Sequence, residues 1–220
     1  MIDTQTDTPP AAGRRTSSRL WREVPILIVA AVCVAFLVRG YVVQTFWIPS
    51  GSMEHTLNVN DRVLVNKLVY DFRDPHRGEV IVFTSPVSWR TSPDEKDFIK
   101  RVIGVGGDRV RCCSNGRLVV NGQPLVEPYL DADGGVGGPS SPDGFDVVVP
   151  NGRLWVMGDN RMHSGDSRQQ WVDTDHDVLA ATIPVSAVIG RAFALFYPTG
   201  RSAWLSVPPT FATVPSGPSG

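Results

Sequence analysis

The segment Ile48-Pro49-Ser50-Gly51-Ser52-Met53 follows an apolar run and precedes the strand-like residues Arg62-Val63-Leu64-Val65. Gly51 allows backbone conformations that are closed to other residues, while Pro49 fixes its own φ and favours an extended Ile48. A tight turn at this position can hold the Ser52 hydroxyl clear of its own main chain. Taken alone, the segment fits either an ordinary Ser/Gly turn after an anchor or a turn that presents a nucleophile.

The residues before this turn predict a membrane anchor. Residues 1–23 are rich in Thr, Pro, Ser and Arg, which is typical of a disordered tail, and an apolar run follows over residues 24–38. The run is shorter than the roughly 20 residues that cross a bilayer, but apolar and aromatic residues up to Trp47 extend the predicted anchor to 24–47. Arginines upstream of it predict a cytoplasmic N-terminus and an extracytoplasmic remainder.

Two other interpretations of the apolar run stay open. A basic region followed by a short apolar core also has the form of a cleaved secretory signal, although small residues at a cleavage site are missing after Leu37. A buried core helix is the third interpretation, but residues 24–38 lack the polar face that such a helix shows.

The rest of the chain predicts a mainly β fold, an antiparallel β domain over residues 48–206. Short strand-like runs alternate with turns at 62–67, 79–83, 97–105, 109–111, 117–120, 145–149, 153–157 and 188–196. Asn121-Gly122 directly after an apolar run predicts a tight hairpin. Residues 131–144 are rich in Gly, Pro, Ser and Asp and predict a flexible insertion, and residues 207–220 predict a disordered C-terminal tail.

Composition limits the function classes. The 220 residues carry a net charge of −1, which gives no support to nucleic-acid binding. Of 21 Lys plus Arg, only Lys67, Lys96 and Lys100 are lysines, which leaves 18 arginines. A retained lysine is informative in such a chain, because lysine readily loses its proton in a protein and arginine does not.

The cysteines and histidines leave alternatives open. Cys112 and Cys113 are adjacent and can form a vicinal disulfide or remain two thiols on opposite faces of a strand. No second Cys or His pair occurs at ligand spacing, so a zinc site is not expected. His163 lies close to Asp159 and Asp166 and could form a Ser-His-Asp triad with Ser52, although a solvated loop histidine is commoner.

Two further clusters contain groups suited to catalysis. In the strand 97–105, Lys100 shares one face with Phe98 and Val102, and apolar surroundings favour the neutral amine, which could take a proton from a serine. The loop 158–168, after the apolar strand 154–157, is dense in Asp, Asn, Ser and Arg and can pair its own charges. Taken alone, each cluster also fits an ordinary structural role: an edge-strand lysine with its ammonium in water, and a turn held by its own hydrogen bonds.

Together the three clusters resemble the bacterial type I signal peptidases. The resemblance covers roughly residues 24–198, in the family's order. The preference for Arg over Lys indicates a GC-rich genome, and the adjacent cysteines and the wording of the motifs resemble actinobacterial members. It rests on Pro49-Ser50-Gly51-Ser52-Met53, Asp61-Arg62-Val63-Leu64-Val65-Asn66-Lys67, Arg77-Gly78-Glu79-Val80-Ile81-Val82-Phe83, Ile99-Lys100-Arg101-Val102-Ile103-Gly104 with Gly107-Asp108, and Gly158-Asp159-Asn160-Arg161 with Ser164 and Asp166-Ser167-Arg168.

The resemblance implies a role for individual residues. It makes Ser52 the nucleophile and Lys100 the general base, with the Ser50 hydroxyl and the Ser52 N–H as the oxyanion hole. Ser164 matches the serine that orients the catalytic lysine. The charged loop residues that match those supporting the site are Asp159, Arg161, Asp166 and Arg168. Met162 and His163 depart from the family's polar residues at these positions, which argues against a direct role for either.

The implied activity is that of a serine endopeptidase which removes N-terminal signal peptides from exported preproteins through an acyl-enzyme. It would cleave after small residues, chiefly Ala at −3 and −1, without a cofactor. The expected partners are signal peptides and the lipid bilayer, for a monomer held in the cell membrane by one helix. Two alternatives are a self-cleaving repressor, which would carry a helix-turn-helix in place of the anchor, and an anchored binding module without activity.

Overall fold

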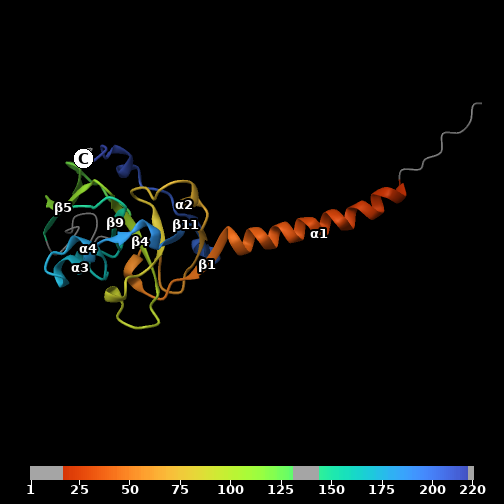
Figure 1. Ribbon diagram of the computed structural model, residues 1–220, viewed down its shortest axis with the longest axis horizontal. Coiled ribbons are helices and arrows are strands. Elements are labelled where there is room, and N and C mark those ends of the chain that lie inside the picture. The colour runs from red at the N-terminus through yellow and green to blue at the C-terminus, as the bar shows by residue number, and fades with distance from the viewer. Residues whose placement is uncertain (1–16, 131–143, 218–220) are drawn as a thin grey trace, which may run out of the picture. The chain divides into compact units, whose positions relative to one another are not determined.

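The computed structural model describes residues 17–130 and 144–217, and the chain divides into two compact units, residues 1–40 and 41–220 (Figure 1). The described part of the first unit belongs to helix α1 (Ser17–Tyr41), which contains Pro25. Within the described residues, no helix combines the length and the apolar character needed to cross a membrane.

The predicted bounds of the N-terminal segments differ from the structure at both ends. The helix begins at Ser17, inside the segment 1–23 that the sequence predicts to be disordered, and residues 1–16 lie outside the described part. At the other end, strand β1 (Val43–Trp47) replaces the last part of the predicted anchor 24–47. Its residues pair with strand β2 (Arg62–Asn66), from Val43 opposite Asn66 to Trp47 opposite Arg62, and a helix could not make these pairs.

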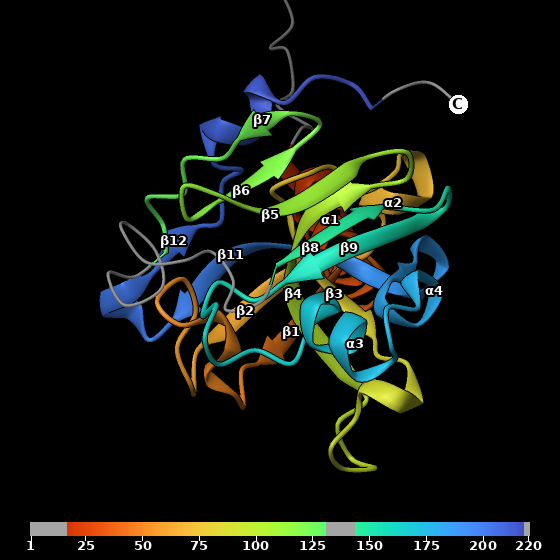
Figure 2. The same ribbon diagram turned by 90° about the vertical axis from the view of Figure 1, so that its left-hand side faces the viewer.

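The second unit is built on two antiparallel sheets (Figure 2), so the mainly β prediction is confirmed. The larger sheet has the order β1-β2-β11-β3-β4-β9-β10, with β12 paired to β11. Its further strands are β3 (Val80–Thr84), β4 (Asp97–Val105), β9 (Arg153–Met157), β10 (Ile183–Pro184), β11 (Val188–Tyr197) and β12 (Ala203–Trp204).

The smaller sheet has the order β7-β6-β5-β8. Its strands are β5 (Arg109–Ser114), β6 (Arg117–Val120), β7 (Gln123–Pro124) and β8 (Phe145–Val148). Asn121 and Gly122 join β6 to β7 with φ angles of 51° and 83°, both positive as a two-residue type I′ turn requires. All eight predicted strands are therefore present, and the predicted hairpin is confirmed.

Helices cover little of the domain. They are α2 (Val69–Phe72), α3 (Ser167–Asp173) and α4 (Val178–Ala181), and α3 contacts α4. The sequence reading did not predict α3, although Asp166 at its N-cap and Gln169 at the third helical position have the spacing of a capping box. Short 3-10 turns lie at Gly51–Met53, Val87–Trp89, Val185–Ala187, Thr199–Arg201 and Pro209–Thr213.

The C-terminal segment corrects a second expectation. The sequence predicts a disordered tail from residue 207, but Phe211 and Val214 are only 5% and 8% exposed and pack in the core cluster of the smaller sheet. Thr210 Oγ1 accepts a hydrogen bond of 2.9 Å from the N–H of Val126. Burial of these apolar side chains holds a segment whose Pro and Gly content indicated disorder. The predicted insertion at 131–144 falls, apart from Gly144, outside the described residues.

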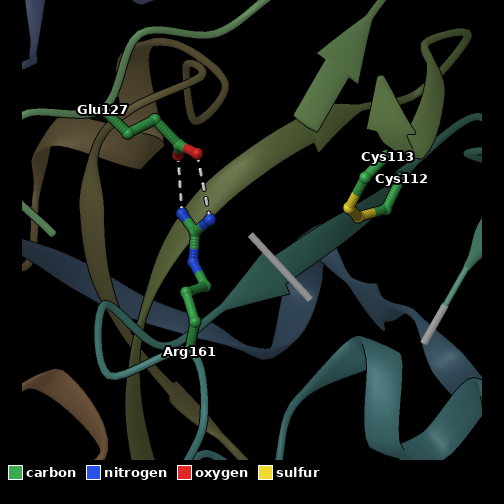
Figure 3. The surroundings of a disulfide bond; sticks show 4 residues. All are labelled: Cys112, Cys113, Glu127 and Arg161. Carbon is green, nitrogen blue, oxygen red and sulfur yellow. Dashed lines mark hydrogen bonds and ion pairs between the residues drawn. A yellow bond between two sulfur atoms is a disulfide. The ribbon is translucent and has the colours of Figure 1, made fainter. Parts of the chain in front are cut away.

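Cys112 and Cys113 form a disulfide at the end of β5 (Figure 3). The structure thus selects one of the two states that the sequence left open. Cys112 is buried and lies opposite Phe145 of β8, whereas Cys113 is exposed. The Phe145 ring in turn packs 5.0 Å from the ring of Trp155, so the buried half of the disulfide adjoins the core between the sheets.

Candidate active site

Ser52 lies in the 3-10 turn that connects β1 to β2. Backbone hydrogen bonds close the segment that contains the turn: the Ile48 N–H donates to the Asp61 carbonyl and the Asn60 N–H donates to the Ile48 carbonyl, each at 2.9 Å. Met53, within the turn, is fully buried in the core. Ser52 itself is 8% exposed. The local sequence therefore holds this serine at the edge of the core on a rigid turn.

Lys100 stands near the middle of β4, between the neighbouring strands β3 and β9. Its amine Nζ lies 2.6 Å from Ser52 Oγ, and the side chain is 4% exposed. The Phe98 ring centre lies 5.5 Å from the same amine. Two residues 48 positions apart, which the sequence singled out separately, are thus in direct contact.

The surroundings of Lys100 favour its neutral form. Burial lowers the pKa of the amine from 10.5 to about 8, because the charged form loses its hydration. The carboxylates of Asp166 and Asp159 act in the opposite direction, and the Arg168 guanidinium lowers the pKa further. A neutral amine at this position can accept the proton of the Ser52 hydroxyl.

Two further serines, Ser50 and Ser164, lie close to Ser52. The Ser50 hydroxyl is 3.5 Å from that of Ser52 and is exposed to solvent. Ser164 Oγ is enclosed against Gly158; it helps to lower the pKa of Asp166 but reaches no described partner with full hydrogen-bond geometry. Gly158 also packs against the carbonyl oxygen of Ser52, so a larger residue there would overlap both serines.

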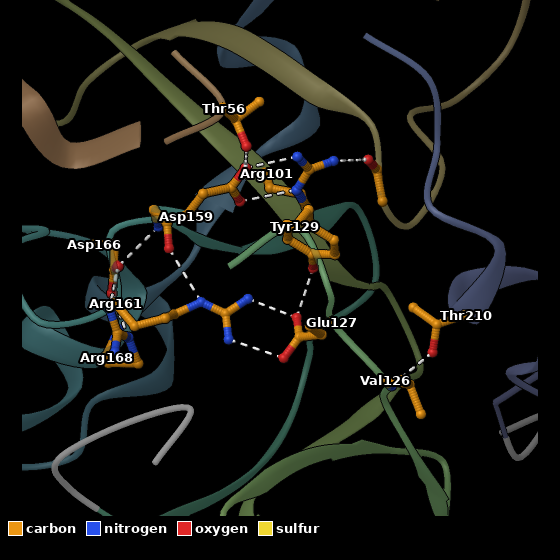
Figure 4. Close-up of polar contacts among 12 residues, drawn as sticks. Thr56, Arg101, Val126, Glu127, Tyr129, Asp159, Arg161, Asp166, Arg168 and Thr210 are labelled. Carbon is orange, nitrogen blue, oxygen red and sulfur yellow. Dashed lines mark hydrogen bonds and ion pairs between the residues drawn. The ribbon is translucent and has the colours of Figure 1, made fainter. Parts of the chain in front are cut away.

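Arg101, which follows Lys100 on β4, forms a buried ion pair with Asp159 (Figure 4). The guanidinium donates to both carboxylate oxygens, at 2.8 and 2.6 Å, and to the Gly78 carbonyl at 2.7 Å. Thr56 adds a hydrogen bond of 2.6 Å to the same carboxylate. Asp159 thereby ties the loop after β9 to β4 and to the segment after the nucleophile turn.

Asp166 and Arg168 form the second buried pair, at 3.0 and 2.7 Å. Burial alone would raise the pKa of the Asp166 carboxyl, but Arg168 and the N–H of Gly158, 2.9 Å away, hold it below its ordinary value. The same carboxylate caps α3 by accepting from the Arg168 N–H. Asp166 therefore stays ionised and fixes Gly158 from one side.

Arg161 and Glu127 form the third pair, with two hydrogen bonds of 2.6 and 3.0 Å (Figures 3 and 4). Arg161 also donates to the Gly158 carbonyl at 3.1 Å, and Tyr129 donates to Glu127 at 2.6 Å. Glu127 follows strand β7, so this pair joins the smaller sheet to the loop of the candidate site. All four predicted supporting residues thus lie in buried ion pairs around Gly158 and Ser52.

Comparison with known proteins identifies the family of this chain. The family described as signal peptidase, peptidase S26, matches residues 21–197. The chain belongs to this signal peptidase family. Signal peptidase I of Mycobacterium tuberculosis is 41% identical over 90% of this chain and 78% of its own length. The probable signal peptidase I of Mycobacterium leprae is 40% identical over 84% of this chain and 78% of its own length.

A solved structure also matches. The crystal structure of a signal peptidase I from Enterococcus faecalis is 26% identical, with a TM-score of 0.41, and covers 54% of this chain and 97% of its own. The family match and the mycobacterial relatives confirm the prediction of an enzyme, a bacterial type I signal peptidase of actinobacterial kind.

His163 is not a partner of the Ser52 hydroxyl in this signal peptidase. It is exposed, and its Nδ1 lies 3.3 Å from Asn160 Oδ1, whereas the Ser52 hydroxyl contacts Lys100 and Ser50. Met162 is exposed as well. The Ser-His-Asp alternative is therefore wrong. Among the described residues, no three His, Cys, Asp or Glu side chains gather in a set that could hold a metal ion.

Sequence reasoning missed several partners of the predicted residues. Glu127 and Tyr129 were not singled out, although they complete the Arg161 pair, and neither was Thr56, which holds Asp159. Their spacing from these partners, 34 residues for Glu127 and 103 for Thr56, leaves no local signal.

Proposed function

We propose that this chain is a membrane-anchored serine endopeptidase that removes N-terminal signal peptides from exported preproteins, with Ser52 as nucleophile and Lys100 as general base. The observation that carries the proposal is the 2.6 Å distance between Lys100 Nζ and Ser52 Oγ. A nucleophile within hydrogen-bond reach of a buried, deprotonatable amine is the arrangement that Ser/Lys hydrolases require. Family membership supplies the substrate class.

The first half of the reaction forms the acyl-enzyme. Neutral Lys100 takes the proton of the Ser52 hydroxyl while Ser52 Oγ attacks the carbonyl carbon of the scissile peptide. The negative charge that develops on the carbonyl oxygen is stabilised by the Ser52 N–H and the Ser50 hydroxyl. The C–N bond then breaks, and the Lys100 ammonium returns its proton to the departing amine of the mature protein.

The second half releases the signal peptide. Lys100, neutral again, takes a proton from a water molecule, whose oxygen attacks the acyl carbon. The ester bond to Ser52 breaks and the serine oxygen recovers its proton from Lys100. Three buried ion pairs support this cycle by fixing the loop 158–168. Asp159 ties the loop to Arg101 on β4, and Arg161 ties it to Glu127 after β7. Asp166 pairs with Arg168 within the loop. Ser164, enclosed beside Gly158, is the residue that would orient the lysine.

Substrate choice follows from the family. The cleavage region of a signal peptide would bind extended and pair with an exposed strand edge, with small residues, Ala-X-Ala, at −3 to −1. The apolar residues 24–38, behind the arginines of the N-terminus, would hold the chain in the cell membrane as a single-pass monomer. The peptidase domain would then lie outside the cytosol, and exposed aromatic residues such as Trp204 suit a lipid interface.

Cleavage of an Ala-X-Ala preprotein by detergent-solubilised enzyme tests the proposal. Wild type should cut at the site, whereas Ser52→Ala and Lys100→Arg should lose nearly all activity, because arginine keeps the charge but cannot act as a base. Lys96→Arg, the same exchange at an exposed lysine, is the matched control and should cut normally. Normal turnover by Lys100→Arg would place the base elsewhere, and a folded wild type that cuts nothing would favour a binding module.

A further inference from the structure

Asn160 holds the nucleophile turn by three separate bonds. Its side-chain Nδ2 donates to the Gly51 carbonyl at 3.0 Å, and its backbone N–H donates to the Ser52 carbonyl at 3.1 Å. The same Nδ2 lies 3.4 Å from a carboxylate oxygen of Glu54, at the end of the turn. Asn160 thus contacts the carbonyl group on each side of the Ser52 Cα.

The bond to the Gly51 carbonyl determines where the Ser52 N–H points. These two groups belong to one peptide unit, which is planar, and this bond is trans in the structure. In a trans peptide the C=O and the N–H point in opposite directions, so a donor that fixes the carbonyl also fixes the N–H. The Ser52 N–H is therefore directed away from Asn160.

The Ser52 N–H is available to a ligand. Among the described residues, no oxygen accepts a hydrogen bond from it, since it lies in the first turn of a 3-10 helix, where N–H groups lack partners within the helix. The Gly51 carbonyl, in contrast, has two donors, Asn160 Nδ2 and the Glu54 N–H at 3.1 Å. The carbonyl of this peptide unit is thus held by two hydrogen bonds, whereas its N–H can donate to a ligand.

We propose that Asn160 is a positioning residue that aims the Ser52 N–H at the oxyanion of the reaction. The inference rests on the proposed function, which makes this N–H one of the two oxyanion donors. A donor aimed before the charge develops stabilises the transition state without reorganisation, and this effect depends on its direction. Asn160 acts through the Gly51 carbonyl and touches no reacting atom itself.

The chemistry of the side chain agrees with this role. Nδ2 faces two acceptors, the Gly51 carbonyl and Glu54, which requires the amide nitrogen on that side. The amide oxygen faces His163 Nδ1 at 3.3 Å, which holds the amide in this orientation. Asn160 is only half-buried, so the protein should fold when the side chain is changed.

Two substitutions of Asn160 test whether its side-chain N–H donor is needed, one with and one without an added negative charge. Asn160→Asp keeps the shape but replaces the donor with an acceptor that faces the Gly51 carbonyl, and Asn160→Leu removes the donor without adding charge. We expect both to lower kcat by about 10- to 100-fold, less than the 10²–10³ that loss of a whole oxyanion donor costs, with KM within about twofold of wild type. Asn115→Asp, the same exchange at an exposed hairpin residue, is the control and should leave kcat unchanged.

A pair of inhibitors distinguishes the proposed positioning role from a merely structural one. A peptide aldehyde forms a tetrahedral adduct when Ser52 Oγ adds to its carbonyl, whereas the corresponding peptide alcohol binds the same pockets without an adduct. Both Asn160 variants should bind the aldehyde more weakly, by the same factor as their loss in kcat. They should bind the alcohol as tightly as wild type does. An equal loss for both inhibitors, or kcat within twofold of wild type, would overturn the role of Asn160.

The same series tells this failure apart from a failure of the proposed function. If Ser52→Ala and Lys100→Arg are inactive while the Asn160 variants turn over normally, the dyad stands and the positioning role is wrong. If Ser52→Ala still cleaves, the nucleophile is misassigned and both proposals are overturned together.

Discussion

Lys100 is 4% exposed, and burial lowers the pKa of its amine from 10.5 to about 8. Because the neutral amine is the base in the proposed mechanism, only roughly one enzyme molecule in ten is active at pH 7. We therefore expect kcat/KM to rise about tenfold per pH unit below pH 8 and to level off above it. A pH profile with a soluble peptide checks this, and a plateau that extends down to pH 6 would contradict it.

Gly158 is the residue where the loop comes nearest to the catalytic pair. A Cβ at this position would lie 2.6 Å from Ser164 Cβ and still closer to Ser164 Oγ and the Ser52 carbonyl oxygen. Gly158→Ala must therefore displace Ser52 or Ser164, and a displacement of about 1 Å can cost about 10²-fold in rate. We expect at least that loss in kcat, measured on the same peptide.

Gly165 provides the matched control for this substitution. It lies in the same loop, but a Cβ there would meet nothing within 4 Å, and its φ is not positive. Gly165→Ala should keep wild-type kcat and thermal stability. If the two alanine variants lose activity equally, the effect belongs to loop flexibility and not to the close approach at Gly158.

The connection between the smaller sheet and the loop 158–168 depends on the Glu127–Arg161 pair. Both side chains are almost fully buried, so Glu127→Gln would leave the Arg161 charge without its counter-ion. Removing one partner of a buried pair costs about 3–5 kcal/mol of unfolding free energy. Urea denaturation of Glu127→Gln should reveal a loss of this order.

Two further variants serve as comparisons for this measurement. The double variant Glu127→Gln, Arg161→Met removes both charges and should recover part of the stability, because no unpaired charge remains. Asp146→Asn breaks the exposed Arg109–Asp146 pair on the same sheet and should hardly move the urea midpoint. If Glu127→Gln is as stable as Asp146→Asn, the buried pair does not stabilise this connection.

The C-terminal segment packs in the core cluster of the smaller sheet. Phe211 is 5% exposed within the core cluster that contains Trp155 and Leu118. Phe211→Ala should therefore cost about 3 kcal/mol of unfolding free energy, as other large-to-small changes in a core do. Thermal denaturation measures this, with Thr213→Ala at an exposed position of the same turn as the control. An unchanged melting temperature would mean that the segment is detached in solution.

The elements differ in how far the sequence could predict them. Strands such as 97–105 and 153–157 carry enough β-branched and apolar residues to be located locally, and Asn121-Gly122 gives the hairpin directly. Val43–Trp47 and the segment around Phe211 were misjudged because their structure depends on distant partners, β2 in one case and the core of the smaller sheet in the other. Composition alone cannot contain that information.

The same contrast holds within the site. Ser52 and Lys100 were found because each stands in a recognisable motif, and the fold then brings them to 2.6 Å. Glu127 stands in no such motif, and its pairing with Arg161 exists only once the smaller sheet has folded beside the loop. The role of Asn160 likewise depends on the direction of a peptide plane, which only coordinates reveal.

The whole chain divides into two units, residues 1–40 and 41–220. All the strands and the candidate site lie in the unit 41–220, whose first strand begins at Val43. The unit 1–40 carries the arginines and the apolar residues 24–38 that led us to propose a membrane anchor. If that proposal is right, the first unit affects which substrates the enzyme reaches but not the chemistry of cleavage.

Removal of residues 1–40 tests this separation. The shortened chain should cleave a soluble Ala-X-Ala peptide with unchanged kcat/KM, because its sheets and ion pairs are intact. Its cleavage of a preprotein inserted in vesicles should fall by about 10²-fold, because co-localisation on one membrane no longer raises the effective concentration of substrate. A chain in which an unrelated apolar helix replaces residues 24–38 should regain the lost rate. Equal cleavage in vesicles with and without residues 1–40 would show that this segment is not an anchor.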